Sequence, residues 1–263
     1  MAAAILLVAA LVVRSLAFNQ NLQWSVVGHY LFSPAILSGV AETLELTLIC
    51  QLIGIVLGTL LALARLSRNP VASTFAIGYG WLFRGIPVLV QLIFWYNLAL
   101  LFPRLSIGLP FTPWGVGVGT NAVITGFSAA VLGLGLNEAA YMAEIIRAGI
   151  IGVDAGQAEA ARALGMRQPQ VLRHVILPQA MRVIVPPTAN QIILMLKATS
   201  LTAFIAGGDL LTQAEGIYSN NFQVIPLLID ASLWYISLTA VATLAQQMLE
   251  RQVGRGVLSG GSR

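Results

Sequence analysis

Two ionisable side chains, Glu138 and Lys197, stand inside long apolar stretches of this 263-residue sequence. At the centre of a bilayer either charge would cost about 2.5–3.5 kcal/mol, so each is a candidate functional group. Asn137 precedes the carboxylate, and Thr199 and Ser200 follow the ammonium. Such a set could bind the opposite charges of a small solute. The equal alternatives are a structural Glu138–Lys197 pair, or burial of these charges against a second subunit.

Lys197 and Ser200 also suggest the nucleophile pair of a hydrolase. Both would lie on one helix at a spacing of three, and accidental spacing explains them more simply. The chain has one cysteine and two histidines, which is too few for a zinc site of ordinary ligand type. We therefore expect no catalytic centre and no metal site in this chain.

Residues 154–178, DAGQAEAARALGMRQPQVLRHVILP, form a polar insert between two apolar parts of the chain. Asp154 can cap the start of a helix, and the alanine-rich run after it favours helix. Gly165 suits the position just after a helix, and Pro169 suits the first turn of the next one. The pattern predicts two short helices that meet near Gly165, the first with a narrow surface of small side chains.

The composition places the chain in a membrane. It is 57% hydrophobic and 9% charged, whereas a soluble domain carries about 25% charged residues. The net charge of +4 is small, and we expect no nucleic-acid partner. The sequence has no G-x-x-x-x-G-K-[ST] loop, and its one lysine follows Leu196. The chain therefore has no P-loop ATPase site of its own.

Five segments are expected to span the membrane, each near the required length of about 20 residues. They are 36–64, 86–102, 122–151, 179–205 and 224–248. Residues 71–83 are too few to span, and we expect them along the interface or slanted into the bundle. Residues 103–119 are expected as an external loop, and Pro186-Pro187 should break or kink the fourth span.

The distribution of basic residues gives the orientation, because Lys and Arg collect in cytoplasmic loops. With these spans, eleven of the fourteen basic residues fall on one side. The insert 154–178 and the C-terminus should therefore be cytoplasmic. Residues 1–33 form an N-terminal apolar and interfacial segment, in which 2–17 are a short or truncated extra helix. A transmembrane domain at 34–250 and a cytoplasmic tail at 251–263 follow.

Four other charged residues receive ordinary interpretations. Asp209 and Asp230 fall near the ends of expected spans, and we expect them in solvated or headgroup positions. Glu144 and Arg147 are three residues apart near the end of the third span. At that spacing they should form an ordinary surface pair on one helix.

The insert carries a recognisable spacing. Glu159-Ala160-Ala161 is followed by three residues, Gly165, nine residues and then VILP at 175–178. This resembles the EAA motif of bacterial ABC-importer permeases, EAA-x3-G-x9-I-x-LP, with Val175 in place of the usual isoleucine. A second Glu-Ala-Ala triplet, at 138–140, does not fit the motif, because Glu144 stands where the motif requires glycine. The resemblance implies an all-α membrane fold, the type I ABC-importer transmembrane domain with five core helices.

The same resemblance implies that the insert is a coupling helix, which docks into a cleft on a cytoplasmic ATP-binding subunit. The residues that it assigns to coupling are Glu159, Ala160, Ala161, Gly165, Leu177 and Pro178. ATP and Mg would be bound by that partner, and no cofactor by this chain. Closure of two such ATP-binding subunits would push on the helices and reorient the cavity.

Four further segments resemble the polar-amino-acid subfamily of these permeases, and the resemblance covers roughly residues 36–250. They are RGIPVLVQ at 84–91, NEAAYMAEIIRAGI at 137–150, ILPQAMRVIVPP at 176–187 and KATSL at 197–201. This implies a multi-pass permease subunit in the bacterial inner membrane. Its substrate would be glutamate, glutamine, aspartate, a basic amino acid or an opine-like solute, met by the candidate pathway residues Asn137, Glu138, Lys197, Thr199 and Ser200.

Several partners follow from that interpretation. They are a dimer of ATP-binding subunits, a second permease subunit that is identical or different, an extracytoplasmic solute-binding protein and membrane lipid. The competing class is a self-contained secondary transporter or channel. Such folds show inverted repeats with broken helices in both halves. Here Pro186-Pro187 has only the segment 84–87 as a loose counterpart, and the insert would be unexplained.

Overall fold

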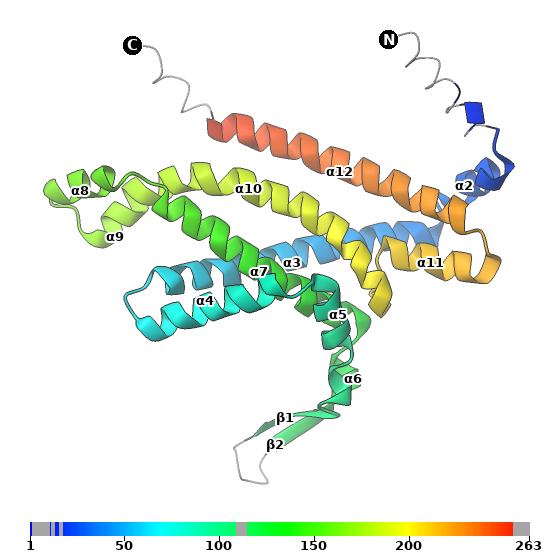
Figure 1. Cartoon of the computed structure of the whole chain (residues 1–263), viewed down its shortest axis with the longest axis horizontal. Helices are drawn as coiled ribbons and strands as arrows, with labels where there is room; N and C mark the ends of the chain where they lie inside the picture. Colours follow the sequence, from blue (N-terminus) through cyan, green and yellow to red (C-terminus); the bar gives the residue numbers. More distant parts are fainter. Residues whose placement is uncertain (2–10, 12–13, 16–17, 109–114, 255–263) are drawn as a thin grey trace.

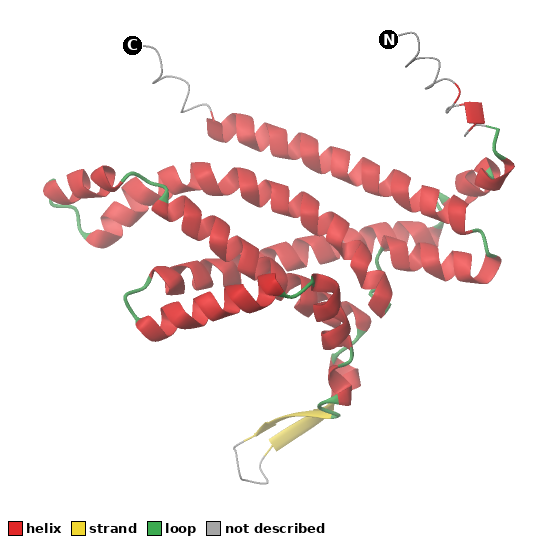
Figure 2. Cartoon of the chain, viewed as in Figure 1, coloured by secondary structure: helices red, strands yellow, loops and turns green. Residues whose placement is uncertain are grey.

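The structure, a computed structural model, describes residues 1, 11, 14–15, 18–108 and 115–254. Long α-helices run side by side, and one β-hairpin projects from them (Figures 1 and 2). Most of the extra helix expected at 2–17, and most of the tail, lie outside the described residues. In chain order the elements are η1 (Gln20–Leu22), α2 (Trp24–Tyr30), α3 (Pro34–Leu66), α4 (Pro70–Gly85), α5 (Val88–Tyr96), η2 (Leu98–Leu100), β1 (Arg104–Gly108), β2 (Gly115–Gly119), α6 (Thr120–Val123), α7 (Gly126–Ile151), α8 (Ala155–Ala163), α9 (Gln168–Val171), the π-helical η3 (Leu172–Ile176), α10 (Leu177–Ala198), the 3-10 helix η4 (Thr199–Ile205), α11 (Leu210–Asn221) and α12 (Val224–Gly254).

Within the described residues, three helices are long and apolar enough to cross a membrane: α3, α7 and α12. Two further candidates are bent pairs. The pair α4 and α5 bends by 97°, and the helical stretch Gln168–Ile205 bends by 41° into α11. Counting each bent pair as one span gives five, the number expected from the sequence.

The helices α3 and α7 pack closely against each other. A Cβ on Gly58 would lie 2.6 Å from Met142 Cβ and 2.9 Å from Ala143 N. Small residues permit this approach, and in lipid such packing takes the place of the hydrophobic drive. Beside this contact, Leu46 of α3 and Leu92 of α5 are fully buried in one apolar cluster. The helices α4, α5, α10 and α11 pack on the α3–α7 pair, and α12 packs on α10 and α11.

Gly58→Ala should lower the stability of the bundle by about 1–3 kcal/mol, because the new Cβ forces two helices apart. The matched control is Gly78→Ala on α4, where a Cβ would meet nothing within 4 Å. That variant should be neutral, or more stable by up to about 1 kcal/mol through helix propensity. The measurement is the thermal unfolding midpoint of each variant in one detergent. Equal midpoints would show that α3 and α7 are not this close.

Side chains hold the sharp break between α4 and α5. Gln91 Nε2 donates to the carbonyls of Phe83 and Ile86, both at 2.9 Å, and Asn137 Nδ2 of α7 donates to Phe83 O at 2.6 Å. Ile86 is extended, as the following Pro87 favours. As a result α5 has only 9 residues. A span formed by residues 86–102 alone is therefore wrong, and a helix pair bent by 97° takes its place.

The segment expected as an external loop at 103–119 contains a β-hairpin, so that expectation is wrong in its local structure. β1 and β2 pair antiparallel, with Arg104 opposite Gly119 and Leu105 opposite Val118. Figure 1 shows the hairpin projecting away from the helices. In RLSIG and GVGVG, large apolar residues stand at every second position, which is the period of a strand. The glycines of these segments are equally typical of a loop.

The helix α10 runs through Pro186 and Pro187 without interruption. Of the expected break or kink, the break is therefore wrong, and the kink stays a prediction. Neighbouring helices in a membrane bundle can satisfy the carbonyls that a proline frees. The chain changes direction later, after η4. There Ala206 and Gly208 both have positive φ, 50° and 89°, and they lead the chain into α11.

Candidate functional site

The polar insert folds as a helical hairpin at one end of the bundle (Figure 1). The Asp154 carboxylate accepts a hydrogen bond from Gly156 N at 2.7 Å, so the expected cap is confirmed. Such a cap satisfies a backbone donor that has no partner within the helix. α8 therefore begins at the residue that the sequence indicates.

α8 ends at Gly165, whose φ is 82°. Gly165 N donates to Arg162 O at 2.9 Å, and Met166 N donates to Ala161 O at 3.2 Å. This pair of bonds is a Schellman motif, and the prediction of a helix-ending glycine is confirmed. A Cβ on Gly165 would meet nothing within 4 Å. The backbone conformation, rather than a lack of space inside the loop, therefore favours glycine here.

The Glu159-Ala160-Ala161 triplet is divided between two faces of α8. Ala161 is buried in a small apolar cluster with Val171, and this contact holds α8 against the start of α9. Glu159 and Ala160 are exposed. Leu164, at the tip of the hairpin, is 84% exposed. The outward surface of α8 therefore combines small side chains with the exposed charges of Glu159 and Arg162.

The return arm of the hairpin is not a separate short helix, so that part of the prediction is wrong. α9 passes through η3 into α10 without a loop. Pro169 lies in the first turn of α9, as expected. Leu177 and Pro178 follow η3 and are exposed. Because helix is continuous from α9 onward, a displacement of the hairpin would move α10 directly.

A cavity of about 250 Å³ lies between α5, α7 and α10. Glu138 is 4% exposed, and its Oε2 accepts from Gln191 Nε2 at 3.3 Å. Its Oε1 has no hydrogen-bond partner within the described part of the chain. The residues that line the cavity are Val88, Leu134, Asn137, Glu138, Tyr141, Gln191, Leu194, Met195 and Ala198. One buried carboxylate with a free acceptor is thus surrounded by neutral side chains.

Of the five candidate pathway residues, Asn137 and Glu138 line this cavity and the other three do not. Lys197 is exposed, and among the described residues it forms no ion pair with Glu138. The structural Glu138–Lys197 pair is therefore not formed. Thr199 and Ser200 donate to backbone carbonyls of their own helix, both at 2.7 Å. The Ser200 hydroxyl bonds the Lys197 carbonyl, which does not assemble a nucleophile pair.

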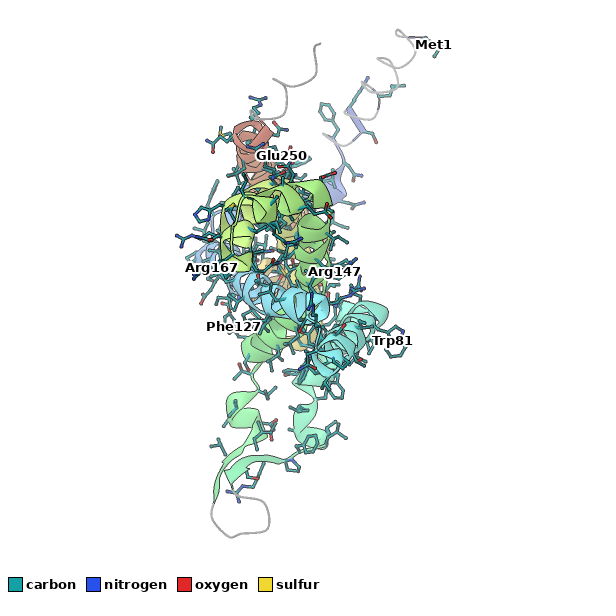
Figure 3. All side chains as sticks on the ribbon, turned by 90° about the vertical axis from the view of Figure 1, so that its left-hand side faces the viewer. Met1, Trp81, Phe127, Arg147, Arg167 and Glu250 are labelled. Carbon is teal, nitrogen blue, oxygen red and sulfur yellow. The ribbon has the colours of Figure 1, made fainter. Side chains whose placement is uncertain are left out.

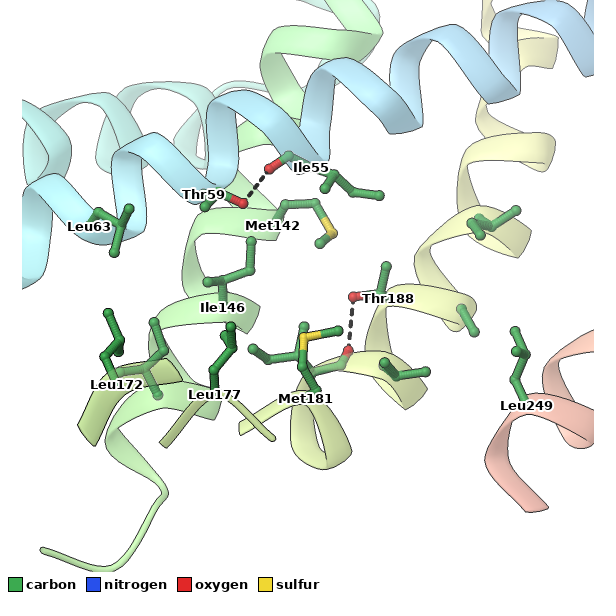
Figure 4. A pocket seen from close by; sticks show the side chains of 15 residues that line it. Ile55, Thr59, Leu63, Met142, Ile146, Leu172, Leu177, Met181, Thr188 and Leu249 are labelled. Carbon is green, nitrogen blue, oxygen red and sulfur yellow. Dashed lines mark hydrogen bonds between the residues drawn. The ribbon is translucent and has the colours of Figure 1, made fainter. Parts of the chain in front are cut away.

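A second cavity, of about 440 Å³, lies on the side of Met142 that faces the insert (Figure 4). It carries two hydroxyl groups, and both are engaged: Thr59 Oγ1 donates to Ile55 O at 2.6 Å, and Thr188 Oγ1 donates to Ile184 O at 2.8 Å. The lining residues are Ile55, Thr59, Leu63, Met142, Ile146, Ile150, Leu172, Leu177, Met181, Ile184, Val185, Thr188, Ala189, Ile192 and Leu249. Such a surface offers no partner to a zwitterion.

Asp209 and Asp230 are fully buried, so the expectation of solvated or headgroup positions is wrong. Asp209 caps α11 and accepts from the hydroxyls of Thr202 and Tyr235, both at 3.1 Å. This network joins η4, α11 and α12. Both carboxylate oxygens of Asp230 lack a partner within the described part of the chain. Sequence reasoning missed these contacts because the partners are distant in the chain.

Glu144 and Arg147 form the expected pair on one helix, but this pair is part of a larger network. The Glu144 carboxylate is shared by three arginines: Arg65 Nη1 at 2.5 Å, Arg84 Nη2 at 3.8 Å, and Arg147. Figure 3, viewed from the end of the bundle that carries the insert, shows Arg147 and Arg167 at that end. The shared carboxylate connects α3, α4 and α7.

Transport, rather than catalysis, is the class of function that this architecture defines. Residues 54–255 match the family described as "Binding-protein-dependent transport system inner membrane component". The chain is 40% identical to the arginine transport system permease protein ArgU of Corynebacterium glutamicum, over 94% of this chain and 79% of that protein. It is 34% identical to the arginine transport system permease protein ArtQ of Bacillus subtilis, over 84% of this chain and 93% of that protein.

Solved structures agree with these relatives. A crystal structure described as an amino acid ABC transporter with histidines has a TM-score of 0.71 and 36% identity, over 84% of this chain and 95% of that chain. An inward-facing MetNI methionine ABC transporter has a TM-score of 0.67 at 20% identity, over 83% of this chain and 96% of that one, and shows the fold alone. The chain belongs to the family of binding-protein-dependent transport inner membrane components. It is a permease subunit of an amino-acid ABC importer, in which ATP hydrolysis belongs to a separate subunit.

Proposed function

We propose that the exposed face of α8 is the surface through which this permease couples to its ATP-binding subunit. Glu159, Ala160 and Gly165 would contact the partner's cleft, whereas Ala161 holds the hairpin together from inside. The observation that carries this proposal is the continuous helix from α9 through η3 into α10. A push on the hairpin would therefore act directly on α10, which supplies Gln191 to the cavity around Glu138. This surface lies on the cytoplasmic side, together with the C-terminus.

The substrate that the cavity fits best is a cationic amino acid. Among the residues that the structure describes, its lining contains one carboxylate, Glu138, and no basic side chain. A buried carboxylate with an unused acceptor favours a ligand that brings a positive charge and hydrogen-bond donors. Two of the relatives support this choice, because both are arginine transport system permease proteins. Glutamate and aspartate would instead add a second negative charge beside Glu138.

The two cavities suggest how a substrate moves. It would bind at Glu138 and pass Met142, which lines the apolar cavity on the way to the insert. No free polar group in that second cavity holds a zwitterion, so a substrate would leave it readily. A second permease subunit, two ATP-binding subunits and an extracytoplasmic binding protein would complete the importer.

Uptake competition tests the substrate class. Proteoliposomes that contain the assembled importer and its binding protein are loaded with ATP and given labelled arginine. Unlabelled lysine and ornithine should compete, and glutamate and aspartate should not. If glutamate competes as well as lysine, the cavity does not select for positive charge. If uptake needs no ATPase subunit, the chain is a secondary transporter, and the coupling proposal is wrong.

A further inference from the structure

Three arginines converge on Glu144, and together these four residues are named the arginine cluster. The helices α3, α4 and α7 each contribute one arginine. Arg65 Nη1 lies 2.5 Å from Glu144 Oε2, Arg84 Nη2 lies 3.8 Å from the same oxygen, and Arg147 pairs with Oε1. Arg65 is in the last turn of α3. The cluster therefore lies at the end of a membrane-crossing helix.

The cluster carries more positive charge than its carboxylate neutralises. Three guanidinium groups and one carboxylate leave a formal charge of +2. Each guanidinium has five N–H donors, far more than two carboxylate oxygens can accept. Arg147 Nε is buried with no acceptor within the described part of the chain. The side chains of Arg65 and Arg84 remain 32% and 35% exposed. A further anion would thus find both unused donors and access.

The neighbouring surface of α4 is apolar and open. It exposes Val71, Phe75, Ile77, Trp81 and Leu82, with Val71 77% and Trp81 75% exposed. Trp81 is labelled in Figure 3 on the outer side of α4. Arg84 folds back along the same helix, its Nε donating to Gly80 O at 3.2 Å. A Cβ on Gly80 would lie 3.3 Å from Arg84 Nη2, so glycine leaves room for this rotamer.

We propose that the arginine cluster binds the phosphate of an anionic phospholipid, whose acyl chains lie along the apolar face of α4. Basic pockets between transmembrane helices bind anionic headgroups in this way, and arginine matches phosphate oxygens with paired donors. The adjoining apolar surface favours a lipid over a soluble phosphate. Glu144 occupies some of the guanidinium donors, and the phosphate would bind those that remain.

The test is lipid binding to the assembled importer in detergent. Native mass spectrometry measures how much phosphatidylglycerol and how much phosphatidylcholine, of equal chain length, the importer retains. The wild type should retain phosphatidylglycerol preferentially. Arg84→Gln should weaken phosphatidylglycerol binding about fivefold, since each basic residue near a membrane surface contributes about that factor. It leaves the closer contacts of Glu144 with Arg65 and Arg147 in place. Arg84→Lys should keep most of the binding.

Two further variants separate lipid binding from a purely structural ion-pair network. Glu144→Gln removes the competing carboxylate, so it should retain or tighten phosphatidylglycerol binding, whereas a structural network alone would make it lose binding. Arg68→Gln, an exposed arginine outside the cluster, should change little. Three results would overturn the proposal: equal binding of both lipids, equal losses in Arg84→Gln and Arg68→Gln, or full displacement of the lipid by inorganic phosphate. The phosphate is used in about 10-fold excess, because it has the headgroup chemistry without the acyl chains.

Discussion

Gly165→Asp should lower ATP-driven amino-acid uptake by roughly tenfold to thirtyfold while the permease still inserts and assembles with its partner permease. The magnitude is that of a central interface residue, about 2 kcal/mol. Gly165 is exposed, and a Cβ there meets nothing within 4 Å. Aspartate also tolerates positive φ better than most residues. The hairpin can therefore accommodate the substitution, and the loss comes from a carboxylate placed on the docking surface.

Neighbouring substitutions separate docking from folding. Gly165→Asn has the same shape and backbone tolerance without the charge, so it should impair uptake less than Gly165→Asp. Glu159→Lys reverses the exposed carboxylate and should uncouple ATP hydrolysis from uptake. Ala161→Leu should act differently, by overfilling the buried contact with Val171 and lowering stability. The measurements are uptake and ATPase rate in the same preparations. Normal uptake by both Gly165→Asp and Glu159→Lys would show that α8 does not couple the permease to its ATP-binding subunit.

Glu138→Gln should reduce the uptake efficiency for a cationic amino acid about thirtyfold or more. Removing one member of a buried charge pair costs 2–5 kcal/mol, because the substrate's charge is then left without a counter-charge. Glutamine keeps the size of the side chain and can still meet the Gln191 amide, so packing against α3 is preserved. The measurement is the concentration dependence of uptake for arginine, glutamine and glutamate. Selectivity for cations should disappear together with affinity.

Lys197→Met is the matched control for that variant. Lys197 is exposed and lies outside the cavity lined by Glu138, so its loss should leave selectivity for cations unchanged. Glu138→Asp keeps the charge and should retain part of the activity. Unchanged affinity and selectivity in Glu138→Gln would show that this carboxylate does not meet the substrate. An equal effect of Lys197→Met would place the site between subunits instead.

Local signals in the sequence predict the coupling hairpin well. Asp154 and Gly165 act within their own turns, through a cap and a Schellman motif, and such contacts depend on residues two to five positions away. The continuous helix of the return arm is not predictable in this way, because no local residue pattern distinguishes the π-helical η3 from a loop. The spans also follow from hydropathy, apart from the bend at α4 and α5. That bend depends on Asn137, which reaches Phe83 from another helix.

The cavity could be predicted only in part. Glu138 is conspicuous as a charge in an apolar stretch, but its partner Gln191 is 53 residues away and neutral, so composition does not mark it. The same applies to contacts of Asp209 and Glu144. These contacts involve Tyr235 and Arg65, which come from other helices. Residue type indicates that a group needs a partner, but only packing decides whether it has one.

The most direct test of the account is uptake by the purified permease in proteoliposomes, with and without its ATP-binding subunit, at fixed internal ATP. We expect uptake to require both ATP and the ATP-binding subunit, and we expect Gly165→Asp to lose uptake while ATP is still hydrolysed. Uptake that persists without the ATP-binding subunit, or is unaffected by Gly165→Asp, would contradict the proposed coupling.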